Sequence, residues 1–63
     1  MDEDLRITIE VRQDDRGPYR VIARFETVSL ALAAFDEAMR QYPSSMIWIR
    51  DRARIIRRSD RAD

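Results

Sequence analysis

The fold is decided by TVSLALAAFDEAMRQY, residues 27–42, the one stretch of this chain with a clear helical period. Its apolar side chains recur at steps of three and four residues, so they lie along one side of a helix. They are Val28, Ala31, Leu32, Phe35, Met39 and Tyr42. Thr27 is the expected N-cap, with Ser29 as the alternative, because a hydroxyl accepts from a free backbone N–H of the first turn. Pro43 ends the helix, since it cannot continue the hydrogen-bond ladder.

Two alternating segments precede this helix. Residues 5–12 and residues 19–26 alternate between apolar and polar side chains, which is typical of half-buried antiparallel strands. Residues 13–18 lie between them and hold Gly17 and Pro18, so the two strands are predicted to form a hairpin. The side chains expected to face the helix are Leu5, Ile7, Ile9, Val11, Tyr19, Val21, Ala23 and Phe25.

Two further segments follow the helix. Residues 46–49 form a short apolar run that predicts a third strand. Residues 55–58 are a weaker candidate for a fourth strand, because the turn before them lacks the Asn or Gly that two-residue hairpin loops favour. Ile47 and Ile49 are expected to face the helix, because the opposite choice would bury Arg50. Met46, Trp48 and Arg50 then lie on the other face of the sheet, together with Ile22.

These segments predict an α+β fold of ββαβ(β) order, with an antiparallel-rich sheet and one helix packed on one face. We expect a single domain over residues 1–63, ordered over 4–58, with polar ends at 1–3 and 59–63. The features at Tyr19–Val21, Phe25–Thr27, Ala31–Ala34 and Ile47–Asp51 resemble those of short bacterial ββαββ domains. The residues that carry this resemblance are structural, so it implies no functional site.

The composition argues against an enzyme. Cysteine and histidine are both absent, which removes thiolate ligands, the commonest metal ligand and the commonest general base. We therefore expect no catalytic residue, no metal and no cofactor. The adjacent acids Asp14–Asp15 and Asp36–Glu37 are interpreted as a solvated turn and a solvated helix face. No apolar run is long enough to span a membrane, and the lack of cysteine fits a cytoplasmic protein.

The size of the chain favours association with a partner. A domain of 63 residues buries only about 60% of the surface that its unfolded chain exposes, so its stability is marginal. The other face of the sheet is expected to carry Ile22, Met46, Trp48 and Arg50. Methionine, tryptophan and arginine are enriched at protein interfaces. We expect Trp48 to stay exposed there until a partner covers it. The predicted function is protein binding, as a homodimer or as an adaptor or inhibitor of another protein.

A nucleic-acid-binding regulator is the alternative. All twelve basic residues are arginine, and six of them fall within residues 50–63. Trp48 could stack on bases while the arginines neutralise phosphates. The residues assigned to this alternative are Trp48, Arg50, Arg52, Arg54, Arg57 and Arg58, with Arg61 beyond them. Three acids interrupt the cluster and the net charge of the chain is zero, which disfavours a strong electrostatic grip on nucleic acid.

Overall fold

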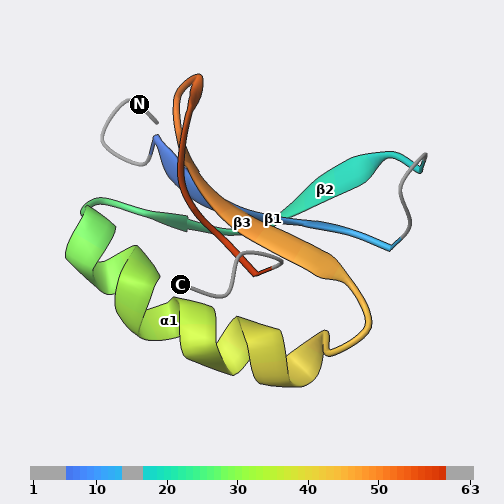
Figure 1. Cartoon of the computed structure of the whole chain (residues 1–63). Coiled ribbons are helices and arrows are strands. Elements are labelled where there is room, and N and C mark those ends of the chain that lie inside the picture. The colour runs from blue at the N-terminus through green and yellow to red at the C-terminus, as the bar shows by residue number, and fades with distance from the viewer. Residues whose placement is uncertain (1–5, 14–16, 60–63) are drawn as a thin grey trace.

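A computed structural model describes residues 6–13 and 17–59 of the chain. Its elements are β1 (Ile7–Arg12), β2 (Tyr19–Phe25), α1 (Val28–Gln41), β3 (Met46–Asp51) and β4 (Arg54–Arg58). The four strands form one antiparallel sheet in the order β2-β1-β3-β4. Helix α1 lies across one face of this sheet, as Figure 1 shows. The predicted α+β class and ββαββ order are confirmed, including the fourth strand.

The ends of helix α1 are set by residues that the sequence analysis singled out. Thr27 is the N-cap, in an extended conformation, and its Oγ1 accepts a 3.1 Å hydrogen bond from the backbone N–H of Leu30. Tyr42 is the C-cap, and its N–H donates to the carbonyl of Ala38. Pro43 follows directly. Both caps satisfy backbone groups that the helix leaves open at its ends.

The core lies between α1 and the two central strands. Its buried members come from all three elements: Ile7, Ile9 and Val11 of β1, Ala31 and Phe35 of α1, and Ile47 and Ile49 of β3. Leu32 and Met39 are half-buried and pack against this cluster. The predicted inward orientation of the apolar side chains of β1, of Ile47 and Ile49, and of the apolar side of the helix is therefore confirmed. Leu5 lies outside the described residues.

A β-bulge in β2 overturns part of the predicted orientation. Ile9 pairs with Ala23 but Glu10 pairs with Val21, so Ile22 is an extra residue in its strand. A strand's side chains alternate between faces, so one extra residue moves those beyond it to the opposite face. Tyr19 and Val21 therefore face away from the helix, and both are exposed. Ile22 was expected on the face away from the helix, but it packs against the core on the helix side.

The β3–β4 hairpin carries a second bulge, and its turn uses an unusual residue. Ile49 pairs with Arg57 and Arg50 with Ile55, so Ile56 is the extra residue and packs against the core. Asp51 pairs with Arg54, which leaves a two-residue turn. Arg52, the first residue of that turn, takes a positive φ of 61°. The hairpin therefore forms without the Gly or Asn that such a turn favours, at a conformational cost.

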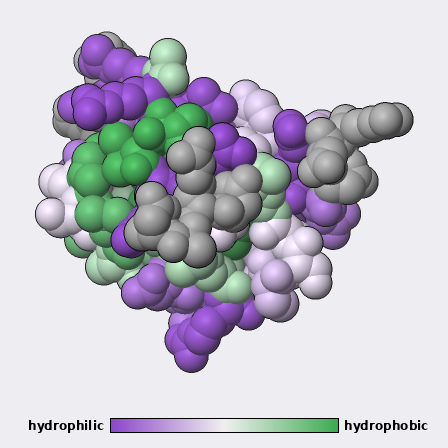
Figure 2. All heavy atoms as spheres, viewed as in Figure 1, coloured by the Kyte–Doolittle hydropathy of each residue, from purple (hydrophilic) through white to green (hydrophobic). Residues whose placement is uncertain are grey.

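The small size of the domain leaves apolar atoms at its surface. In the view of Figure 2, strongly apolar side chains gather in one group, bordered by hydrophilic ones. Large apolar residues that remain exposed are Tyr19, Val21, Leu30 and Ile55. Three of these four lie on the hairpins, and Leu30 lies on the helix. Helix α1 covers only one of the two faces of the sheet (Figure 1).

Candidate binding face of the sheet

The face of the sheet opposite α1 is called the open face below. Residues that are directly paired across antiparallel strands share a face, so the strand registers define its members. From β1 and β3 they are Thr8, Glu10, Arg12, Met46, Trp48 and Arg50, and from β2 and β4 they are Tyr19, Val21, Arg24, Ile55 and Arg58. The open face is therefore rich in arginine, with aromatic and apolar side chains among the charges.

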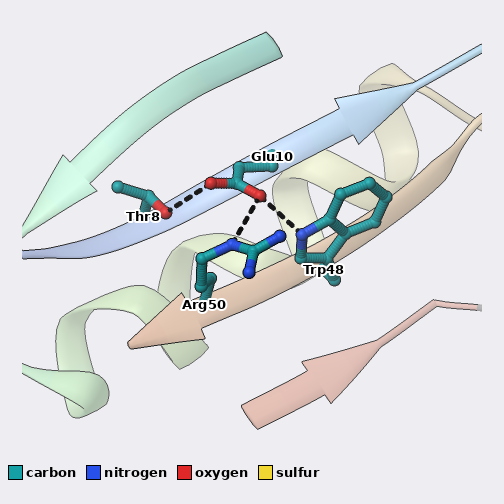
Figure 3. A network of polar contacts seen from close by, with 4 residues as sticks. All are labelled: Thr8, Glu10, Trp48 and Arg50. Carbon is teal, nitrogen blue, oxygen red and sulfur yellow. Dashed lines mark hydrogen bonds and ion pairs between the residues drawn. The ribbon is translucent and has the colours of Figure 1, made fainter. Parts of the chain in front are cut away.

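Glu10 lies at the centre of the open face and is 4% exposed. Its Oε1 accepts a 2.6 Å hydrogen bond from Trp48 Nε1 and a 3.0 Å charge-assisted bond from Arg50 Nε. Its Oε2 accepts from the hydroxyl of Thr8 at 3.1 Å. Figure 3 shows the four side chains meeting across β1 and β3. A buried carboxylate is tolerated because three donors replace its water.

Trp48 faces away from the helix, as predicted, but it is not exposed. Only 7% of the residue is accessible within the single chain, so the expectation of a solvent-exposed Trp48 is wrong. Tyr19 covers it in an edge-to-face contact, with ring centroids 5.8 Å apart. The physical reason is the β2 bulge, which brings Tyr19 onto this face. The indole N–H has Glu10 as an internal acceptor, so its burial leaves no donor unsatisfied.

Tyr19 forms the outer layer of this cluster and is 51% exposed. The guanidinium carbon of Arg50 lies 5.7 Å from the centroid of the Tyr19 ring, a distance that permits a cation–π interaction. Arg50 thus contacts both Glu10 and Tyr19. An exposed aromatic ring is held in place by two partners, which lowers the entropy lost when another molecule packs on it.

A cavity of about 190 Å³ lies on the open face between β1, β3 and β4. Its lining is Arg12, Met46, Trp48, Arg50, Ile55 and Arg58. Three arginine residues therefore line a hollow whose other lining residues are apolar. An η nitrogen of Arg58 lies 3.9 Å from the sulfur of Met46. Arg12 Nε is buried and has no hydrogen-bond acceptor among the described residues, and no other buried side-chain nitrogen or oxygen of that set shares this condition.

A second hollow, of about 330 Å³, lies on the helix side near the first hairpin. Its lining is Val11, Gln13, Gly17, Pro18, Arg20 and Tyr42. Arg20 is the one charged residue in this lining. Two lining residues, Gln13 and Gly17, are separated in the sequence by residues 14–16, which are outside the described residues. The cavity of the open face, with three cations, is therefore the stronger candidate for a binding site.

The predicted arginine cluster is divided among several surfaces. Arg50 and Arg58 line the open-face cavity. Arg57 lies on the helix side, with its guanidinium carbon 6.0 Å from the centroid of the Phe35 ring. Arg52 lies in the hairpin turn and is exposed. Arg54 lies opposite Asp51 on the helix side and is also exposed. The cluster that is continuous in the sequence is therefore not one surface in space. Arg61 lies outside the described residues.

The acid pairs show no sign of a metal site in the part of the chain that the structure describes. Asp36 and Glu37 are both exposed, and no group of three or more potential ligands occurs in that part. Glu37 accepts from Gln41 Nε2 at 3.0 Å and pairs with Arg40. These contacts, that of Gln41 foremost, lower the pKa of the Glu37 carboxyl. Asp14 and Asp15 lie outside the described residues.

Comparison with known proteins assigns no relative to this chain. No family model, no curated protein and no solved structure matches it. Among the described residues, no helix has the length and apolar character needed to cross a membrane. The candidate site therefore depends on its geometry alone.

Sequence reasoning named none of the following open-face residues as part of a site: Thr8, Glu10, Arg12, Tyr19, Val21, Arg24 and Ile55. The first three had a signal, because they are the polar positions of the alternating segment at 5–12. Pairing that segment with residues 46–51 would have placed Glu10 beside Trp48. Tyr19 had no such signal, because its position depends on the bulge at Ile22.

Proposed function

We propose that this chain is a non-enzymatic protein-binding domain that uses the open face of its sheet. One observation carries the proposal. Tyr19, half-exposed, is fixed on this face by Trp48 and Arg50, and the same face also carries the exposed side chains of Val21 and Ile55. Tyrosine, tryptophan and arginine are the residue types that dominate binding energy at protein interfaces. A rigid aromatic ring beside apolar side chains suits a partner surface.

The charge of the open face favours an acidic partner. Among the described residues of this face, the one carboxylate is that of Glu10, which accepts hydrogen bonds from Arg50, Trp48 and Thr8. Arg12 and Arg58 lie on the same face and line the same cavity. Counted over its described residues, the face thus carries more arginine side chains than carboxylates around its cavity. Two copies packed with their open faces together would bring like charges close, so a different, acidic protein is favoured over a second copy.

Two features favour protein over nucleic acid as the partner. Trp48 is buried, so it offers no face for a base to stack on. The arginines of residues 50–58 point to different sides of the hairpin and do not line one track for a phosphate backbone. Tyr19 remains as one exposed aromatic ring on the open face. Nucleic-acid binding is therefore the second candidate.

Selection from a displayed library of random peptides tests the proposal. Selected peptides should be enriched in acidic and apolar residues, and Tyr19→Ser combined with Ile55→Ser should weaken their binding at least tenfold. Leu30→Ser is the matched control, because Leu30 is exposed on the helix. Unchanged binding by the double variant contradicts the proposal. Tighter binding to a single-stranded oligonucleotide that depends on the same residues would favour the second candidate.

The solution mass of the chain decides which protein the open face binds. A monomer at micromolar concentration is expected, because the open face repels its own copy. A dimer that dissociates in the Tyr19→Ser variant would identify the partner as a second copy, as the sequence analysis predicted. A dimer that is insensitive to Tyr19 and Ile55 would place self-association on another surface and leave the open face available for a different protein.

A further inference from the structure

We infer that the open-face cavity is a carboxylate-binding subsite, which receives one acidic side chain of the partner protein. The inference rests on the proposed function and gives its partner a specific chemistry. The cavity measures about 190 Å³, below the roughly 300–1,000 Å³ of pockets that hold whole small molecules or cofactors. Its size suits a single side chain carried by a larger molecule.

The guanidinium of Arg12 supplies the first argument. Its Nε is buried and has no acceptor within the described residues, although Arg12 lines the cavity. A buried donor without a partner destabilises the folded state, and an arginine cannot become neutral to avoid this. A carboxylate in the cavity would give this cation a charged acceptor. The binding of an acidic group in the cavity would therefore give the charge of Arg12 an ion-pair partner, which it lacks among the described residues.

Arg50 supplies the second argument, because its position is fixed before any ligand arrives. Its Nε donates to Glu10 at 3.0 Å, and its guanidinium lies against the Tyr19 ring. The remaining guanidinium nitrogens of a side chain held in this way are available as donors without a large loss of side-chain entropy. Glu10 is thus a positioning residue, since it orients Arg50 while Thr8 and Trp48 hold its own carboxylate.

The apolar walls supply the third argument. Met46, Trp48 and Ile55 line the cavity beside the arginines. A glutamate side chain matches this lining, because its methylene groups can contact the apolar walls while its planar carboxylate accepts two parallel bonds from a guanidinium. A phosphate shares the anionic chemistry but has no apolar stem. The combination therefore favours an acidic side chain of a protein.

Nuclear magnetic resonance titration of the full chain tests the inference. The probe is N-acetyl-glutamate amide, and N-acetyl-glutamine amide is its neutral counterpart. Trp48 is the only tryptophan, so its indole N–H cross-peak reports on the cavity without ambiguity. The glutamate probe should shift this cross-peak saturably at millimolar concentration, and at least tenfold more tightly than the glutamine probe. Equal affinities for the two probes would overturn the inference.

Three variants locate the subsite. Arg12→Met should weaken the glutamate probe about tenfold, and Arg12→Lys should not restore it, because lysine lacks the planar fork. Arg54→Met removes the same charge from an exposed position outside the cavity and should leave affinity unchanged. If Arg12→Met and Arg54→Met behave alike, the effect is one of net charge and the subsite is refuted.

Two further results separate this inference from the proposed function. Inorganic phosphate that binds tenfold more tightly than the glutamate probe would replace the carboxylate with a phosphate ligand and overturn the inference. Selected peptides whose binding depends on Tyr19 but not on Arg12 would leave the proposed function standing and refute the subsite alone. Binding of the glutamate probe without any peptide binding would leave a carboxylate site on the open face but refute both the protein-binding function and a protein side chain as the occupant.

Discussion

Trp48 Nε1 donates a 2.6 Å hydrogen bond to Oε1 of Glu10, the residue directly opposite it across the β1–β3 pair. The contact joins residues 38 positions apart in the sequence, and both are buried on the side of the sheet away from the helix. A small domain with one helix thus builds a second, polar cluster on the face that its helix cannot cover. We therefore expect both sides of the sheet to contribute to the stability of the chain.

Removal of the Glu10 carboxylate tests this polar cluster. Glu10→Ala should lower the free energy of unfolding by about 2–4 kcal/mol, because it leaves the indole N–H of Trp48 and the charge of Arg50 without their acceptor. Glu10→Gln should cost less, since an amide oxygen still accepts. Urea denaturation measures both, with Glu26→Ala as an exposed control in the segment before the helix. A Glu10→Ala variant as stable as the parent would contradict the importance of the cluster.

The burial of Trp48 predicts weak quenching of its fluorescence. As the single tryptophan, it should be poorly accessible to iodide in the folded monomer, and Tyr19→Ala should increase that accessibility severalfold. The physical reason is that Tyr19 covers the indole edge-to-face. Leu30→Ala, a change on the helix, is the control. Full accessibility of Trp48 in the parent would restore the expectation of an exposed ring.

Truncation of Phe35 tests the docking of the helix. The residue is fully buried among the isoleucines of β1 and β3, so Phe35→Ala should cost about 3–5 kcal/mol. This equals most of the stability expected of a domain this small. The variant should be unfolded or nearly so by circular dichroism, while Leu30→Ala melts like the parent. Equal melting temperatures for Phe35→Ala and the parent would show that the helix docks through other residues.

Replacement of Arg52 by glycine should stabilise the protein. Arg52 has a positive φ of 61°, which costs a residue with a Cβ about 1–2 kcal/mol. Glycine removes that cost but adds freedom to the unfolded chain, so the net gain is at most about 1 kcal/mol. Thermal unfolding measures it. Arg52→Ala is the matched control, because it removes the same charge and keeps the strained conformation. A gain in the alanine variant equal to that in the glycine variant would assign the effect to charge.

The contacts of Glu37 predict a pH dependence. Gln41 and Arg40 lower the pKa of the Glu37 carboxyl in the folded chain below its value in the unfolded chain. The unfolded state therefore binds the proton more readily, and the contribution of Glu37 to stability is present above the unfolded-state pKa and lost as the pH falls through the folded-state value. Glu37→Gln should differ from the parent at neutral pH and match it in acid. Carbon-13 titration should show the pKa of Glu37 rising in Gln41→Ala, whereas an unchanged pKa would contradict the assigned cause.

The sequence by itself determined the secondary structure and one side of the core. The helical period at 27–42, the cap at Thr27 and the stop at Pro43 are local effects, so they could be predicted from neighbouring residues. The inward orientation of Ile47 and Ile49 followed from alternation, since the other choice would bury Arg50. Each of these inferences needs only residues that lie close together in the chain.

Only the tertiary structure decided the open face. The bulges at Ile22 and Ile56 each insert one residue into an alternating strand, and nothing in the alternation itself marks where that happens. A shift of one residue reverses the face of every side chain beyond it, which is why Tyr19 covers Trp48 and Ile22 does not. The register of β1 against β3 then sets Glu10 opposite Trp48, a pairing fixed by packing between distant segments.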